Sequence, residues 1–141
     1  MPDSPAILFV CLHGAAKSLI AARYCERLAD ARGIRISCAS AGLEPDSAVP
    51  PDVISGLAAD GIDVAGFHPG LPTARMVAEA THVVALGCDL AAFSPEGGVV
   101  RWEDVPAVSD GYVVARDAIV ERVERFLDEV VLKIPVATVD G

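Results

Sequence analysis

The feature that most constrains this chain is a short apolar run that ends at a cysteine and leads into a glycine-containing loop. Residues 6–10 are all apolar, and Cys11 follows them directly. A run that is apolar on both faces is typical of a central strand in a parallel sheet, because helices cover such a strand on both sides. We expect a loop at 12–17 and then a helix from 18 to about 31.

Strands and helices are expected to alternate along the rest of the chain. Further strands are predicted at 34–39, 81–88 and 99–102, and further helices at 52–60, 73–80 and about 112–131. The segment 40–50 contains Gly and Pro and is expected to be a loop. This alternation predicts one α/β domain over residues 1–141, with a central four-stranded parallel sheet as the middle of three layers and helices on both faces.

The junction after the first strand has the components of an oxyanion site. Ligands bind beyond the carboxyl ends of parallel strands, where both Cys11 and Cys88 are expected. A helix N-terminus there presents unpaired N–H groups, which bind an oxyanion and stabilise a thiolate. Gly14 permits a left-handed turn, Lys17 adds positive charge, and Ser18 is either the helix N-cap or a donor to the thiolate. Cys11 is therefore a candidate nucleophile, and the alternative is an inert strand-end thiol.

Composition limits the partners of the chain. The net charge of −9 argues against nucleic acid and anionic membranes, so any oxyanion must be held by local donors. The four cysteines lack CxxC spacing and only three histidines are present, so we expect no metal site. We also expect no stable disulfide, because the cytosol keeps thiols reduced. Cys25 and Cys38 are expected to be core thiols. Without a membrane-length apolar run or a basic leader, a cytoplasmic protein is expected.

The loop sequence, Cys11-Leu-His-Gly-Ala-Ala-Lys17-Ser18, resembles that of the low-molecular-weight protein tyrosine phosphatase superfamily. That family, which includes thioredoxin- and mycothiol-linked arsenate reductases, has Cys, five residues, Arg and then Ser or Thr after its first strand. The resemblance continues in order through Ser40-Ala41-Gly42, 61–63, His68-Pro69, 83–88, Trp102, Val105-Pro106 and the last helix. It implies the family's fold. The residues that it assigns to oxyanion binding are Leu12, His13, Gly14, Ala15, Ala16, Lys17 and Ser18.

Two positions of the loop depart from the family pattern, and one cysteine outside it matches. Lys17 stands where the family has Arg, and an ammonium cannot grip two oxygens as a planar guanidinium does. Ala16 replaces the second loop cysteine of the family's phosphatases. Cys88 matches the first of the extra cysteines that the family's reductases use, but no second one follows in 89–95. A reductase would then form a Cys11–Cys88 disulfide or use an external thiol; the alternative for Cys88 is a packed thiol.

The general acid of the family is also replaced. The family carries an Asp-Pro pair after the last strand, and the corresponding residues here are Ala107 and Val108, which hold no proton to donate. Asp104, Asp110 and His13 are the nearby residues that could substitute, although each is more simply explained as a solvated loop residue.

Three functions remain open from the sequence. The first is an arsenate-reductase-like thiol enzyme with Cys11, Lys17, Ser18 and Cys88 as catalytic residues. It needs no cofactor beyond a thiol donor such as thioredoxin or a small thiol. The second is a protein tyrosine or aryl phosphatase that forms a phosphocysteine on Cys11. The third is a non-catalytic oxyanion-binding protein on the same scaffold. The expected partners are a small oxyanion, arsenate or phosphate, or a phosphorylated substrate.

Overall fold

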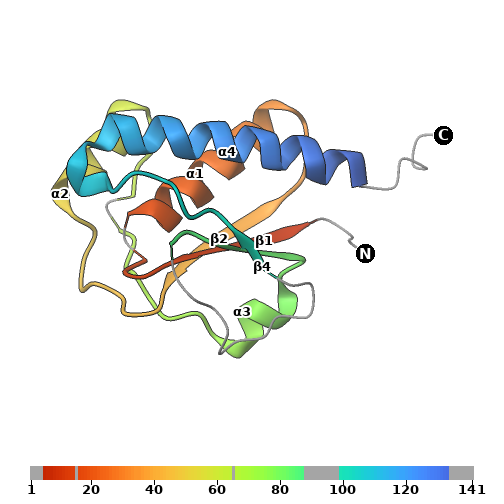
Figure 1. Cartoon of the computed structure of the whole chain (residues 1–141), viewed down its shortest axis with the longest axis horizontal. Coiled ribbons are helices and arrows are strands. Elements are labelled where there is room, and N and C mark those ends of the chain that lie inside the picture. Colours follow the sequence, from red (N-terminus) through yellow and green to blue (C-terminus); the bar gives the residue numbers. More distant parts are fainter. Residues whose placement is uncertain (1–4, 15, 65, 88–98, 134–141) are drawn as a thin grey trace.

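The computed structural model (Figure 1) describes residues 5–14, 16–64, 66–87 and 99–133, within which strands and helices are interspersed. The strands are β1 (Ala6–Cys11), β2 (Ser37–Gly42), β3 (His82–Ala85) and β4 (Val99–Arg101). The helices are α1 (Lys17–Ala31), α2 (Pro51–Ala59), α3 (Ala74–Glu79) and α4 (Tyr112–Lys133), with a 3-10 turn, η1 (Val108–Asp110), before α4. No helix within these ranges is long and apolar enough to cross a membrane.

The sheet confirms the expected α/β architecture. Its four strands are all parallel, in the order β2–β1–β3–β4. Helices α1 and α4 lie over one face of the sheet and α3 lies over the other (Figure 1). The carboxyl end of β1 therefore lies between those of β2 and β3, and the residues that follow Cys11 leave the sheet at an interior position of its edge.

Side chains of β1 alternate between the cores on the two faces of the sheet. Phe9 faces α1 and α4, whereas Leu8 and Val10 face α3. The Phe9 ring lies 5.8 Å from that of Trp102 and 6.5 Å from that of Phe126, measured between centroids. Each such buried side chain contributes about 1.5–3 kcal/mol to stability. The strand that carries Cys11 is thus fixed on both faces by packing.

The second strand is the element whose expected bounds were wrong. It was expected at 34–39, but β2 begins at Ser37 and continues to Gly42, inside the segment expected to be a loop. The amide of Ile34 donates to the carbonyl of Ala29 at 2.9 Å, so the turn that ends α1 still uses it. Residues 40–42 pair with the end of β1 although Ser, Ala and Gly carry no strand signature.

Candidate functional site

Three hydrogen bonds hold the loop after β1 against the segment that follows β2. They join the amides of Leu43, Glu44 and Asp46 to the carbonyls of Cys11, Leu12 and His13, at 3.2, 2.7 and 3.1 Å respectively. All three loop carbonyls therefore point toward 43–46. We call the side of the loop that faces 43–46 its outer side. The three bonds lie on that side, so they leave the opposite, inner side available for a ligand.

The inner side of the loop carries amide donors. A trans peptide holds its N–H opposite its C=O, so the amides of Leu12, His13 and Gly14 point away from 43–46. The Gly14 amide donates to Sγ of Cys11 at 3.1 Å, as this direction requires. Successive N–H groups on one side of a loop form a concave site for an anion. Ala15, the next residue assigned to oxyanion binding, lies outside the described residues.

Two glycines allow the loop to lie directly against β2. Gly14 has φ +67°, and a methyl group on it would lie 2.6 Å from the backbone nitrogen of Gly42. A methyl group on Gly42 would lie 2.4 Å from the backbone nitrogen of Gly14. No side chain fits at either position without moving backbone. The two backbones are therefore in contact, and this contact fixes where the loop amides point.

The Ser18 hydroxyl is the second polar group at the thiol. Its Oγ lies 3.1 Å from Sγ of Cys11 and 3.3 Å from the carbonyl oxygen of Ala41, and the residue is fully buried. Helix α1 begins at Lys17 with Ala16 at the N-cap position and no side-chain cap, so an N-cap role for Ser18 is wrong. If the hydroxyl rotates from the Ala41 carbonyl to the sulfur, it donates a hydrogen bond to a Cys11 thiolate. This is the second role that the sequence predicts for Ser18.

Cys11 lines a pocket of about 500 Å³ at this edge of the sheet. Lys17 lines it as well, and a methyl group on Gly87, just after β3, would lie 3.8 Å from the Lys17 Nζ. Lys17 forms no ion pair with any residue that the structure describes. The apolar part of the lining consists of Leu12, Ala16, Pro50, Val53, Leu86, Ala107 and Val108. Two carboxylates that sequence reasoning missed, Asp46 and Asp52, also line the pocket.

The other described cysteines do not line this pocket, whereas Cys11 does although only 6% of it is exposed. Cys25 is fully buried, and Cys38 is half-buried beside it. The hydrogen bond with Cys25, together with burial, raises the pKa of the Cys38 thiol far above its usual value, so this thiol stays protonated. Both are core thiols, as expected. Cys88 lies outside the described residues. Among the residues that are described, no three His, Cys, Asp or Glu side chains are grouped so that they could hold a metal ion.

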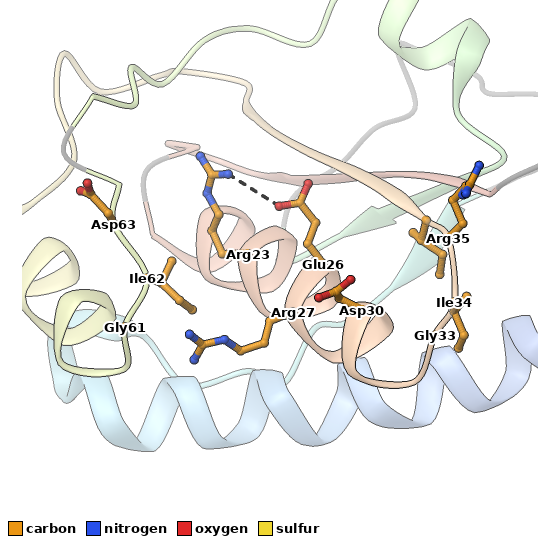
Figure 2. A pocket seen from close by; sticks show the side chains of 11 residues that line it. Arg23, Glu26, Arg27, Asp30, Gly33, Ile34, Arg35, Gly61, Ile62 and Asp63 are labelled. Atoms are coloured by element: carbon orange, nitrogen blue, oxygen red, sulfur yellow. Dashed lines mark ion pairs between the residues drawn. The ribbon is translucent and has the colours of Figure 1, made fainter.

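A second hollow, of about 740 Å³, lies beside α1 (Figure 2). Its charged lining residues are Arg23, Arg27, Arg35, Glu26, Asp30 and Asp63. Arg23 and Glu26 point toward each other as an ion pair at 3.6 Å, and Arg27 donates to the carbonyl of Asp60 at 2.5 Å. This hollow contains equal numbers of acidic and basic side chains and no nucleophile. We therefore assign the functional site to the pocket at Cys11.

The family model for low molecular weight phosphotyrosine protein phosphatases matches residues 6–95, which include the loop and the first three strands. The chain belongs to this family. A comparison with curated proteins finds no match.

Solved structures of the phosphatase family have the same fold. The thioredoxin-dependent arsenate reductase of Corynebacterium glutamicum is 25% identical with a TM-score of 0.80, over 93% of this chain and 64% of that one. This chain thus spans less than two thirds of that protein's length. The arginine phosphatase YwlE of Geobacillus stearothermophilus is 21% identical, over 92% and 94% of the two chains, with a TM-score of 0.77. A low molecular weight protein tyrosine phosphatase from Bacillus subtilis is 18% identical, over 91% and 98%, with a TM-score of 0.76.

The candidate substitutes for the family's general acid differ in whether they line the pocket that contains Cys11. Ala107 and Val108 both line the pocket, so two side chains without an acidic proton lie there. Asp104 forms an ion pair with Arg122 on α4 and does not line the pocket. Asp110 is exposed and does not line it either. Of the three substitutes, His13 alone is brought to the pocket that contains Cys11.

Proposed function

We propose that this member of the family is a thiol-dependent oxyanion enzyme that reduces arsenate, with Cys11 as its nucleophile. The observation that carries the proposal is the position of the thiol. Cys11 lines the pocket, and both the Gly14 amide and the Ser18 hydroxyl lie 3.1 Å from its Sγ. Charge-assisted bonds from such groups favour a thiolate over a thiol.

The first step is the addition of arsenate to Cys11. The thiolate forms an S–As bond, one As–O bond breaks, and the departing oxygen leaves as water after it takes up a proton. The loop amides and the ammonium of Lys17 hold the remaining oxygens of arsenate. Local donors have to do this, because a chain with a net charge of −9 repels an anion at long range. Ser18 stabilises the thiolate that attacks. Arsenic remains As(V) in this step.

The second step transfers two electrons to arsenic. A second thiolate attacks Sγ of Cys11, a disulfide forms, and the S–As pair leaves with arsenite. We assign the second thiolate to Cys88 or to an external thiol. The external thiol is thioredoxin or a small thiol, and it also reduces the disulfide afterwards. No other cofactor is required. We place this chemistry in the cytoplasm, where thiols are kept reduced.

The direct test is arsenite formation from arsenate with thioredoxin and, separately, with a small dithiol as donor. Cys11→Ser should lower the rate by a factor on the order of 10³ or more, because the nucleophile is lost. Cys38→Ser is the matched control and should leave the rate within about twofold, since that thiol lies in the core. If the natural chain forms no arsenite with either donor, the proposal is wrong.

A phosphatase is the second candidate, and the apolar lining of the pocket favours it. Leu12, Pro50, Val53 and Val108 offer an aryl ring a surface beside the thiol. Such an enzyme would transfer the phosphoryl group to Cys11, release the aryl alcohol, and then hydrolyse the phosphocysteine. We expect turnover of aryl phosphates with good leaving groups. Full activity of Cys11→Ser on these esters would contradict the assignment of the nucleophile.

The same assays also test the non-catalytic alternative. If the natural chain binds oxyanions but turns over neither substrate, the double variant Lys17→Arg, Ala107→Asp should create the activity. It would supply both the bidentate donor and the acidic proton that this chain lacks. A competent natural enzyme excludes this alternative.

A further inference from the structure

His13 is held at the pocket by two acceptors on the segment after β2. Its Nδ1 lies 3.1 Å from the carbonyl oxygen of Glu44 and 3.3 Å from Oδ1 of Asp46. A carbonyl and a carboxylate only accept, so Nδ1 carries a hydrogen and donates it. The nitrogen not engaged by these partners is Nε2. His13 and Asp46 both line the pocket that contains Cys11, so a carboxylate of the lining fixes the direction of this imidazole.

The reaction needs a proton donor in this pocket, and few described side chains there can supply one. When Cys11 attacks, the oxygen that departs from arsenic or phosphorus must be protonated unless it is a good leaving group. The titratable side chains of the lining are Cys11, His13, Lys17, Asp46 and Asp52. Cys11 attacks, Lys17 binds the anion and Asp46 holds the imidazole. His13 and Asp52 are left as candidates for the proton.

We propose that His13 is the general acid of this site and that Asp46 orients it; this inference rests on the proposed function of Cys11. As the sulfur bond to arsenic or phosphorus forms, the bond to the departing oxygen breaks and that oxygen keeps the electron pair. The oxygen takes the Nε2 proton of the doubly protonated imidazole, while Asp46 holds the Nδ1 hydrogen. Neutral imidazole remains, and in the phosphatase reaction it then accepts a proton from the water that attacks the phosphocysteine.

The test compares two esters that differ in how much they need a proton donor. Phenyl phosphate has a poor leaving group and 4-nitrophenyl phosphate a good one. His13→Asn should lower turnover of phenyl phosphate by about a hundredfold, in the usual range for a lost general acid, and turnover of 4-nitrophenyl phosphate by less than about tenfold. Asp46→Asn should show the same pattern with smaller losses. Added imidazole should restore phenyl phosphate turnover to His13→Ala, which a purely structural role would not allow.

A histidine away from the pocket provides the matched control for His13→Asn. His68 is exposed and does not line the pocket, so His68→Asn should change neither ester. If the natural chain turns over arsenate but neither ester, the same variants are measured on the first turnover of arsenate. There His13→Asn should slow the formation of arsenite about tenfold or more, with rescue by imidazole.

The outcomes separate this inference from the proposed function. If the natural chain shows no Cys11-dependent turnover of any of the three substrates, arsenate and the two esters, both the proposed function and the inference are wrong. Ester turnover without formation of arsenite overturns arsenate reduction alone, and the inference is then tested on the esters. An active natural chain in which His13→Asn slows both esters equally, or slows neither, overturns the inference and leaves the function standing. A selective loss in Asp52→Asn instead would identify Asp52 as the donor and likewise overturn the inference.

Discussion

The pocket at Cys11 and the cluster around Asp60 both gather polar groups, but they use them in opposite ways. At Asp60 the groups satisfy one another: the Tyr24 hydroxyl donates to the carboxylate, and Arg116 Nη1 lies 3.1 Å and the Tyr112 hydroxyl 3.5 Å from the same oxygen. These contacts join α1, α4 and the end of α2. Their role is to hold the three helices together.

At Cys11 the donors lie around the pocket, and within the described part of the chain no single group accepts from all of them. The loop amides point inward, Lys17 has no ion-pair partner among the described residues, and the space before them measures about 500 Å³. Unsatisfied donors cost free energy unless water or a ligand meets them. The difference teaches that a closed polar cluster stabilises this fold, whereas the open one is the candidate site of function.

The first way to break this comparison is to place a methyl group between the loop and β2. Gly14→Ala should destabilise the chain by about 2–4 kcal/mol, because it adds a backbone clash to the cost of positive φ. Oxyanion binding should be lost even where the variant still folds. The measurements are the free energy of unfolding in urea and the affinity for phosphate by calorimetry.

Gly33→Ala is the matched control for this variant. Gly33 has a similar φ of +72°, but a methyl group there would meet nothing within 4 Å. We expect a cost of about 1 kcal/mol and unchanged phosphate affinity. Equal costs at the two glycines would show that the contact between the loop and β2 adds nothing.

The second variant removes the charge from the closed cluster. Asp60→Asn should lower the free energy of unfolding by about 1–3 kcal/mol, because it weakens hydrogen bonds to a charged acceptor that is partly buried. Turnover at Cys11 should be unchanged within about twofold once the variant is folded. A large loss of turnover at full folding would contradict the separation of the two regions.

The closed cluster should also give stability a pH dependence. The hydrogen bond from Tyr24 and the contacts with Arg116 hold the pKa of Asp60 below its usual value, and burial with the same bond raises the pKa of Tyr24 to about 12. A lowered pKa in the folded state means that Asp60 contributes stability above the unfolded value of 3.8. This contribution is lost as pH falls below that value through the folded pKa. Urea unfolding between pH 3 and 6 should show a smaller decline in Asp60→Asn than in the natural chain.

The smallest expected effect sharpens the description of the open site. Lys17→Arg should tighten the binding of phosphate and arsenate about three- to tenfold, because a guanidinium donates two parallel bonds where an ammonium acts as a point charge. Lys17→Met should weaken binding by a similar factor. Competition with a chromogenic aryl phosphate measures both. Weaker binding by Lys17→Arg would mean that the pocket is shaped for the shorter cation.

Much of the fold could be predicted from the sequence because its signals are local. The apolar run before Cys11 predicted the central strand, and the three- and four-residue spacing of Ile119, Val123 and Phe126 predicted the last helix. The end of β2 could not be predicted in this way. Its pairing depends on a glycine contact between segments far apart in the chain, and no propensity records such a contact.

The candidate site was predictable only where its residues are adjacent in sequence. The loop from Cys11 to Ser18 carries its own pattern of cysteine, glycine and hydroxyl. The carboxylates of Asp46 and Asp52 carry no such pattern, because the turn after β2 and the start of α2 bring them to the pocket. The contact between His13 and Asp46 was likewise invisible in the sequence.

The most direct test of the central claim is the alkylation of Cys11 by iodoacetamide with and without arsenate or phosphate, read by mass spectrometry of the modified peptide. Cys25 and Cys38, which do not line the pocket, serve as internal references for unfolding. If the loop binds an oxyanion over the thiol, Cys11 is alkylated first, and either anion slows its alkylation about tenfold or more at saturation without protecting the other two. An unchanged rate of Cys11 alkylation at saturating arsenate and phosphate would contradict the account.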